Sequence, residues 1–294
     1  MRTHQQMPAH ELQLVRAPKA LAALAHLAGL HPQELGGPVR EPATLELAPE
    51  FDGLERRRGA LAATVSAAIS DWLWNPFAQA QRATLLDWSD ALATFARQVL
   101  GWPAAQWWAH GYDPVAQVLL GSATSAPSTD LVDHVAEQAP PIILHQLSTS
   151  STFVDEELPA AQLSDLDLTS RSTEPIACWR VRAQTGARVY EIQRLTDWLT
   201  LCDDYPRVHA VPDSWRRAGA DGRFGISPEW QNVARDWDGV HFSMMGVLSA
   251  SDVALTLGTY AVVPPSLNTE VTYWLRHAFR DPELLGTWHG ELPD

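Results

Sequence analysis

The C-terminal half of the chain is organised around one stretch, Ser227-Pro228-Glu229-Trp230-Gln231-Asn232-Val233-Ala234-Arg235-Asp236-Trp237-Asp238-Gly239-Val240-His241-Phe242-Ser243-Met244. Serine followed by proline and glutamate is typical of a helix start, so this pattern predicts a helix over 228–236 with Ser227 as its N-cap. Asp238-Gly239 predicts a tight turn, and 240–243 predicts a strand that leaves the turn. We expect a pocket wall here, because Asp238, His241 and Ser243 would lie close together beside tryptophans.

The spacing of Asp238 and His241 predicts a hydrogen bond between the two side chains. Such a bond would raise the pKa of His241 by stabilising the charged imidazolium. A two-histidine, one-carboxylate metal site built from His241, Asp238 and a distant His209 is the weaker interpretation, since a turn residue pairs with a neighbouring histidine more often than with a metal. We therefore expect no bound metal.

The block Asp238-Gly239-Val240-His241-Phe242-Ser243 with Gly246 resembles the last motif of the GDSL/SGNH hydrolases. The resemblance implies a general base at His241, oriented by Asp238, for an activated serine. The Gly-Asp-Ser turn that carries the nucleophile in that family does not occur in this sequence.

A second resemblance rests on the order of three short segments, Trp179-Arg180-Val181, Phe242-Ser243 and Asn268-Thr269-Glu270. This order is similar to that of the arginine, serine and glutamate in enzymes of the ADP-ribosyltransferase fold. The resemblance implies that Arg180 holds the diphosphate of NAD, that Ser243 steadies the ribose, and that Glu270 stabilises the developing oxocarbenium ion. The three side chains are then expected to converge on one cleft. A structural alternative pairs Arg180 with Glu191 across a hairpin.

A third resemblance covers more of the chain. The segments 188–192, 197–198, 230–246 and 270–274 are similar to C-terminal segments of uncharacterised actinobacterial-type proteins. This resemblance implies a self-contained module with a pocket.

The sequence predicts an α+β protein, with a helical N-terminal domain over 1–146 and a mixed α+β domain with a mainly antiparallel sheet over 174–294. Apolar residues recur at helical spacing in 78–100. Residues 147–173 are rich in Ser, Thr, Asp and Glu and are interpreted as a linker or surface loop. Residues 176–181 and 188–192 alternate like strands around Gln184-Thr185-Gly186, which predicts a hairpin.

The composition limits the classes of partner. With 46% hydrophobic and 19% charged residues, the chain of 294 residues is expected to bury a core. A net charge of −14 argues against general binding to DNA or RNA. No apolar run is long enough for a membrane span or a signal peptide, so we expect a cytoplasmic protein without a membrane partner. The 2 cysteines have no zinc or disulfide spacing.

Tryptophan is unusually frequent, with 13 residues, and serves either core packing or stacking on a ligand. Trp107 and Trp108 are expected to be partly exposed, because neighbouring helix positions cannot both face one core.

The sequence thus predicts a C-terminal pocket for a small molecule or nucleotide, lined by Trp179, Arg180, Tyr190, Trp237, Asp238, His241, Ser243 and Glu270. The favoured form is an NAD-using, ADP-ribosyltransferase-like enzyme, with Trp179, Arg180, Tyr190 and Trp237 contacting the cofactor. The alternatives are a non-catalytic binding or assembly protein, with a protein partner or a second copy of the chain, and an SGNH-type esterase.

Overall fold

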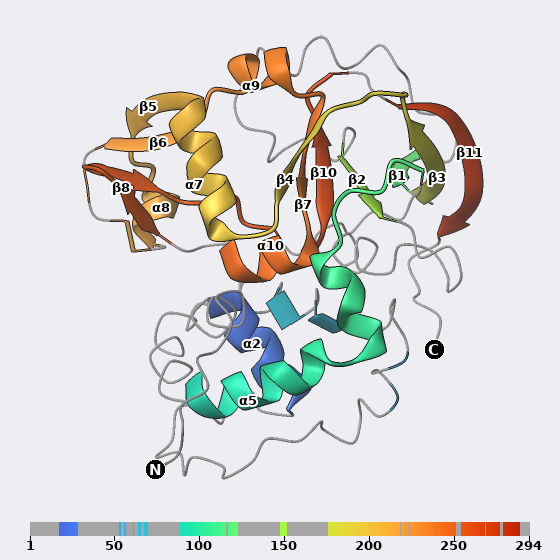
Figure 1. The fold of residues 1–294 in the computed structure, drawn as a ribbon, viewed down its shortest axis with the longest axis horizontal. Helices are drawn as coiled ribbons and strands as arrows, with labels where there is room; N and C mark the ends of the chain where they lie inside the picture. Colours follow the sequence, from blue (N-terminus) through green and yellow to red (C-terminus); the bar gives the residue numbers. More distant parts are fainter. Residues whose placement is uncertain are drawn as a thin grey trace.

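The computed structural model describes residues 18–28, 53, 56, 61, 64, 65, 68, 69, 89–115, 117–122, 148–151, 176–217, 219, 220, 222, 224–250, 254–267, 269–276 and 279–288. These residues form helices and two mixed sheets, an α+β arrangement (Figure 1). Within these ranges no helix has the length and apolar composition needed to cross a bilayer.

The larger sheet has seven strands in the order β11-β3-β1-β2-β10-β7-β4. Every pairing in this sheet is antiparallel except that of β4 with β7, so the sheet is mainly antiparallel, as predicted. The strands are β1 (Gln117–Ser122), β2 (Ser148–Ser151), β3 (Ile176–Ala183), β4 (Val189–Ile192), β7 (Gly239–Phe242), β10 (Val271–Trp274) and β11 (Phe279–Trp288).

The predicted hairpin between β3 and β4 does not form. β3 pairs with β1 on one side and β11 on the other, whereas β4 pairs in parallel with β7. The tight turn at 184–187 is present, because the Ala187 N–H donates to the Gln184 carbonyl. The two strands and the turn between them were predicted correctly. They do not pair with each other, because β1 and β11, which come from distant parts of the chain, lie on the two sides of β3.

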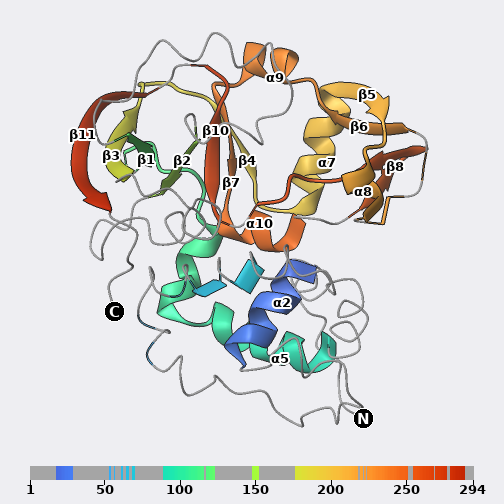
Figure 2. The ribbon, with the colours of Figure 1, turned by 180° about the vertical axis from the view of Figure 1, so that it is seen from behind.

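The seven-stranded sheet is strongly curled (Figure 1, Figure 2). β3 and β4 are separated by five interstrand spacings, or about 24 Å in a flat sheet. The six Cα steps from Ala183 to Val189 span at most about 22 Å, which is less than that separation. The connection between β3 and β4 is therefore possible only because the sheet is curled. Curling also explains why Val189 of β4 packs against a cluster that contains Leu119 of β1 and Val181 of β3.

The smaller sheet has the order β5-β6-β9-β8. Its strands are β5 (Pro206–Ala210), β6 (Phe224–Pro228), β8 (Leu255–Leu257) and β9 (Tyr260–Val262), with α8 (Asp213–Arg217) between β5 and β6 in the chain. The helix α7 (Leu195–Asp204) places Trp198, Leu201 and Cys202 in a core shared by both sheets, as its amphipathic pattern requires.

The helix α9 (Trp230–Asp236) forms where the sequence predicts it but begins two residues later. Ser227 is not its N-cap: it lies in β6 and is paired with Arg207 of β5. The Glu229 N–H extends this pairing by donating to the Tyr205 carbonyl at 2.7 Å. Strand pairing therefore holds 227–229 extended and takes precedence over the local capping signal.

The described N-terminal elements are α2 (Pro18–Leu27), α5 (Ser89–Leu100) and the 3-10 helix η4 (Pro103–Ala109). The amphipathic pattern of α5 is confirmed by the burial of Leu92, Phe95 and Val99. Trp107 and Trp108 were expected to be partly exposed, but both are buried, because η4 packs against α5 and against α10 (Met244–Ala250).

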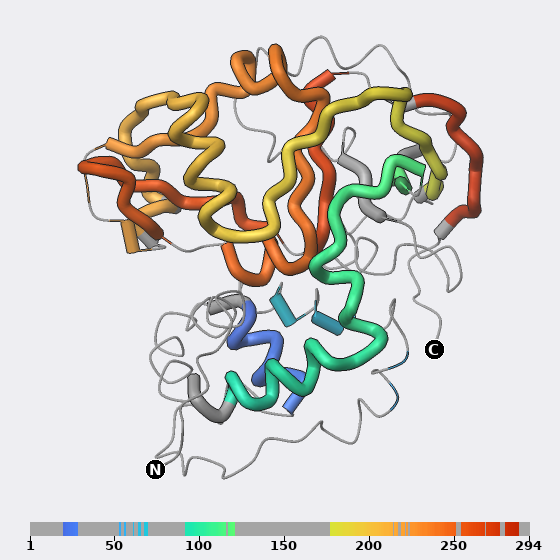
Figure 3. Tube along the Cα trace, in the orientation of Figure 1, coloured from blue at the N-terminus to red at the C-terminus, as the bar shows by residue number. Residues whose placement is uncertain are grey.

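The larger sheet takes strands from both sides of the predicted boundary at residue 147. β1 comes from the range predicted to be a helical domain, and β2 comes from the range predicted to be a linker. The chain leads from α5 through η4 toward β1, as the trace in Figure 3 shows. In the described part of the chain, residues of α10 pack both with the N-terminal helices and with the core under the sheets.

Candidate functional site

Three neighbouring strands bring a row of polar side chains to one face of the larger sheet. Glu191 on β4 is directly paired with His241 on β7, and His241 is paired with Thr272 on β10. Glu270 directly precedes β10 and lies two residues before Thr272, so it shares the same face. The alternate residues of these strands, such as Val240 and Phe242, face the apolar core on the other side.

His241 is hydrogen-bonded through both ring nitrogens to carboxylates. Nδ1–H donates to Glu191 Oε2 at 2.7 Å, and Nε2–H donates to Glu270 Oε1 at 2.8 Å. Ionised carboxylates only accept hydrogen bonds, so both nitrogens carry protons and the imidazole is positively charged. The side chains of His241, Glu270 and Glu191 are 1%, 5% and 34% exposed, so Glu191 is the member of this group that solvent reaches.

Two opposing effects act on the pKa of His241. Burial lowers the pKa, because a low dielectric disfavours the charged form. The hydrogen bonds to Glu191 and Glu270 and the negative charges of these carboxylates outweigh burial and raise the pKa from 6.5 to about 9. His241 is therefore an imidazolium at neutral pH, held between the two carboxylates.

The loop after η4 closes over this group. The Tyr112 N–H donates to Glu191 Oε1 at 2.7 Å, and the Tyr112 ring contacts His241 edge to face, with centroids 6.2 Å apart. Gly111 passes so close that an added Cβ would lie 3.3 Å from Glu191 Oε1. A side chain at position 111 would therefore press on the carboxylate.

A second polar chain lies on the same face. Thr272 Oγ1 donates to Gln117 Oε1 at 3.3 Å, and Gln117 Nε2 donates to the Asp113 carbonyl at 2.9 Å. Thr272 and Gln117 are both buried. Together with Glu191, His241 and Glu270, they form a polar group on this face, beside the apolar cluster that contains Leu119, Val181 and Trp274.

The predicted bond between Asp238 and His241 is wrong. Asp238 Oδ2 accepts from the Arg188 N–H at 2.7 Å, and Oδ1 pairs with Arg276 Nε at 2.6 Å. Asp238 precedes β7 and ties the start of β4 to the end of β10. The prediction of a raised His241 pKa agrees with the structure, but the cause is the pair of glutamates on neighbouring strands.

The structure does not bring Arg180 together with Ser243 and Glu270. Arg180 lies on β3, three strands away from β10 in the sheet order, and alternates with Trp179 and Val181. It therefore points to the sheet face opposite His241. Its guanidinium pairs with Glu283 of β11 at 3.4 Å, so the alternative pairing with Glu191 is also absent.

Ser243 has a structural role at the start of α10. Its Oγ accepts a hydrogen bond from the Gly246 N–H at 3.1 Å, which is the geometry of a serine N-cap. The hydroxyl is buried and lies beside the Ile192 carbonyl. Because His241 is held by Glu191 and Glu270, the structure gives Ser243 no general base.

The remaining predicted residues divide between the two faces. Trp179 packs against the cluster of Leu119, Val181, Ala183 and Trp274, on the same face as His241. Tyr190 and Trp237 lie on the other side and contact each other edge to face, 5.2 Å between centroids. The Tyr190 hydroxyl donates to the Asp197 carbonyl, and Trp237 Nε1 donates to the Tyr205 hydroxyl. These two aromatic side chains belong to the packing of α7 and α9.

Two residues of the site escaped the sequence analysis, Glu191 and Tyr112. The signal for Glu191 was a carboxylate inside the apolar strand Val189–Ile192, where charge is unusual without a partner. Tyr112 lies in a loop 79 residues before Glu191, and no local pattern connects the two.

The group formed by Glu191, His241 and Glu270 is suited to hold a proton rather than a metal. Each imidazole nitrogen is directed at a carboxylate at hydrogen-bond distance, so neither offers a lone pair to a cation. Across the described ranges, no set of three or more His, Cys, Asp or Glu side chains has the geometry of a metal site. What the group offers a ligand is one solvent-reached carboxylate beside a fixed positive charge.

Comparison of the chain with protein-family models, with curated proteins and with solved structures found no match.

Proposed function

We propose that the polar face around Glu191, His241 and Glu270 is the site of an enzyme that binds a small molecule or nucleotide, with Glu191 as its proton-accepting group. The observation that carries the proposal is the buried imidazolium held between two carboxylates, one of which is partly exposed. Strongly shifted pKa values produced by burial and specific charge partners are concentrated at functional sites.

Stability alone is a poor reason for such a group. Moving charges out of water costs several kcal/mol per ion, and well-packed apolar residues of the same volume often stabilise a protein as much or more. A buried His241 with Glu191 and Glu270 is better explained by the chemistry that it permits. The positive charge of His241 compensates for the negative charges that the two carboxylates bring close together.

Glu191 is the group that meets the ligand in this proposal. Its oxygens each accept one hydrogen bond, from Tyr112 N–H and from His241 Nδ1–H. A carboxylate has about four acceptor sites, so Glu191 can accept a further proton or hydrogen bond from a ligand. His241 does not act on the ligand directly, because both of its nitrogens are engaged.

NAD is the first ligand to test. Two carboxylates and one imidazolium leave one net negative charge, which favours the positive charge that develops on a ribose when a glycosidic bond to nicotinamide breaks. In this form of the proposal Glu191 and Glu270 supply that stabilisation. Arg180 has no part in it, since its side chain is directed to the opposite sheet face and pairs with Glu283.

Calorimetry with NAD at up to millimolar concentration tests the proposal on the wild type, Glu191→Gln and the control Glu229→Gln. Glu229 is 31% exposed and pairs with Arg207. Its exposure matches that of Glu191, and it lies at the start of α9, directly after β6 of the smaller sheet. We expect NAD to bind the wild type and the control equally, and Glu191→Gln to bind about tenfold more weakly, the loss typical of a hydrogen bond to a charged group.

Two outcomes would contradict the proposal. Failure of NAD to bind the wild type at millimolar concentration would remove the NAD form, and equal binding by all three proteins would place the ligand elsewhere. In the first case the binding or assembly protein becomes the leading interpretation, with the exposed Val208 and Phe224 on β5 and β6 as the first surface to examine.

A further inference from the structure

The hydroxyl of Tyr112 is buried beside the proposed site and has no hydrogen-bond partner. In the described part of the chain it is the one buried hydroxyl in this condition. The rest of Tyr112 is firmly placed: its N–H donates to Glu191, and its ring contacts His241 and Trp274 edge to face. The ring that carries the orphan oxygen is therefore held at a defined position, in contact with His241 and Trp274.

Packing does not account for this hydroxyl. A phenylalanine would make the same ring contacts with His241 and Trp274 without burying an unpaired polar atom, and an unpaired buried polar atom costs free energy. Nearly all buried polar groups in folded proteins have a partner, so an orphan indicates a partner that is missing from the protein itself. Burial, reinforced by the charges of Asp113 and Glu191, raises the pKa of Tyr112. The hydroxyl thus stays protonated and can donate.

A second unpaired donor lies on the same apolar cluster. Trp179 Nε1 is buried without a partner, and both Trp179 and Tyr112 pack against the cluster of Leu119, Val181, Ala183 and Trp274. Buried indole N–H groups without a partner also occur at Trp108 and Trp198, in the other cores. Trp179 by itself is therefore weak support, and the inference depends on Tyr112.

The chemistry of these groups defines the ligand. Glu191 accepts hydrogen bonds, Tyr112 donates one, and aromatic side chains provide flat apolar faces. A cyclic polyol has hydroxyl donors for the carboxylate, oxygen acceptors for the tyrosine and C–H faces for the rings. We infer that the site recognises the ring of a cyclic polyol, as a free sugar or as the ribose of a nucleoside, through the Tyr112 hydroxyl and the Glu191 carboxylate. This inference rests on the proposed function and names the part of the ligand that the site holds.

Ligand-observed NMR with D-ribose and with adenosine tests the inference on the wild type, Tyr112→Phe and Tyr205→Phe. Tyr205→Phe is the matched control, because it removes a tyrosine hydroxyl that already has partners, Asp236 and Trp237. We expect Tyr112→Phe to weaken binding about five- to tenfold, the loss of one hydrogen bond to the ligand. The control should bind as the wild type does. Binding of D-ribose with this dependence identifies a free sugar, and binding of adenosine alone identifies a nucleoside.

Unfolding in urea supplies a readout that does not need a ligand. Tyr112→Phe should unfold at the same or a higher urea concentration than the wild type, because it removes an unpaired polar atom. A lower midpoint would reveal a partner within the protein and overturn the inference. Equal ligand binding by Tyr112→Phe and the wild type, or no binding of either probe at millimolar concentration, would also overturn it.

The two proposals can fail separately. If NAD binding depends on Glu191 but no probe depends on Tyr112, the proposed function stands and the recognition of a polyol by Tyr112 is wrong. If Tyr112→Phe weakens binding of adenosine or ribose while Glu191→Gln does not, a polyol binds here but Glu191 is not its acceptor.

Discussion

His241 carries a positive charge at a position that water does not reach. Its two carboxylate partners come from the strands on either side, Glu191 from β4 and Glu270 from the start of β10. The charge therefore links three strands of the larger sheet. Removing the imidazole would take the hydrogen bond to His241 away from the buried Glu270 carboxylate, and removal of one partner from a buried ion pair typically costs about 3–5 kcal/mol.

The stability of the protein should depend on pH through His241. The pKa of His241 is raised from 6.5 to about 9 in the folded state, so its contribution is fully present below pH 6.5 and is lost as the pH rises through 9. We expect this contribution to be about 3 kcal/mol. His241→Gln should cost about 3–5 kcal/mol at pH 6, and this difference from the wild type should shrink toward pH 10.

Urea unfolding between pH 6 and pH 10 checks this prediction, with Asp238→Asn as the control. Asp238 pairs with Arg276 and not with His241, so its variant should lose stability by a similar amount at every pH. A constant difference between His241→Gln and the wild type would show that His241 is not charged in the folded protein. If the stability of Asp238→Asn no longer changed with pH, Asp238 would be the residue that raises the pKa of His241, as the sequence alone suggested.

At the scale of elements, α10 lies unusually close to the end of β4. A Cβ added at Gly246 would overlap the Ile192 carbonyl oxygen. The obstacle is backbone on both sides, and it cannot move aside as a flexible side chain would. This close approach places α10, which follows His241, against β4, which carries Glu191. Ser243 lies directly before α10 and caps it.

Gly246→Ala should therefore destabilise the protein, although alanine is favoured over glycine within helices by about 1 kcal/mol. We expect a loss of about 1–3 kcal/mol, the range for an overpacked core. Thermal and urea unfolding measure it. Ser249→Ala on the same helix is the control and should change stability less, because the Ser249 hydroxyl makes only a long, 3.5 Å bond to the Gly246 carbonyl. A gain in stability for Gly246→Ala would contradict the close packing of α10 on β4.

Residues of α10 belong to two hydrophobic cores. Met244, Met245 and Leu248 pack with the helices α2 and α5 and with η4, whereas Val247 packs with the core under the sheets. Both ribbon views place α10 between the N-terminal helices and the larger sheet (Figure 1, Figure 2). The helix thus joins the two halves of the chain, and we expect them to unfold together.

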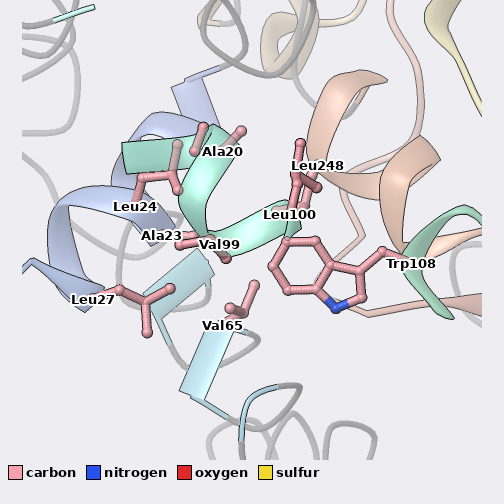
Figure 4. A pocket seen from close by; sticks show the side chains of 10 residues that line it. Ala20, Ala23, Leu24, Leu27, Val65, Val99, Leu100, Trp108 and Leu248 are labelled. Atoms are coloured by element: carbon pink, nitrogen blue, oxygen red, sulfur yellow. The ribbon is translucent and has the colours of Figure 1, made fainter. Parts of the chain in front are cut away.

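Leu248→Ala tests this coupling. Leu248 lines a small apolar cavity with Ala20, Leu24, Val99, Leu100 and Trp108 (Figure 4). Its truncation should enlarge the cavity and cost about 2–5 kcal/mol. Leu284→Ala on β11 is the control and should cost no more than about 0.5 kcal/mol, because Leu284 is half exposed.

Urea unfolding followed by tryptophan fluorescence and by far-ultraviolet circular dichroism gives the measurement. Coincident transitions in the wild type and in Leu248→Ala are expected for one cooperative unit. Two separate transitions in the wild type would mean that the helices and the sheets are independent, and that α10 does not connect them.

The local elements could be predicted because their signals lie within a few residues. Apolar spacing indicated α5, and the apolar run after Asp238-Gly239 indicated the strand β7, although Gly239 lies in β7 itself rather than in a turn. The α+β class follows from these elements. Two local signals failed, the cap at Ser227 and the Asp238–His241 bond, because strand pairing gave each of these residues other partners.

The site itself was decided by the tertiary structure. His241 is 50 residues from Glu191 and 29 residues from Glu270, and only the pairing of β4, β7 and β10 brings the three together. Register is set by contacts between distant strands, and a shift of one residue would turn each side chain to the other face. The sequence alone identified His241 and Glu270 as candidate site residues in the C-terminal half. Which carboxylates hold His241, and which face Arg180 occupies, depended on long-range pairing that no local pattern encodes.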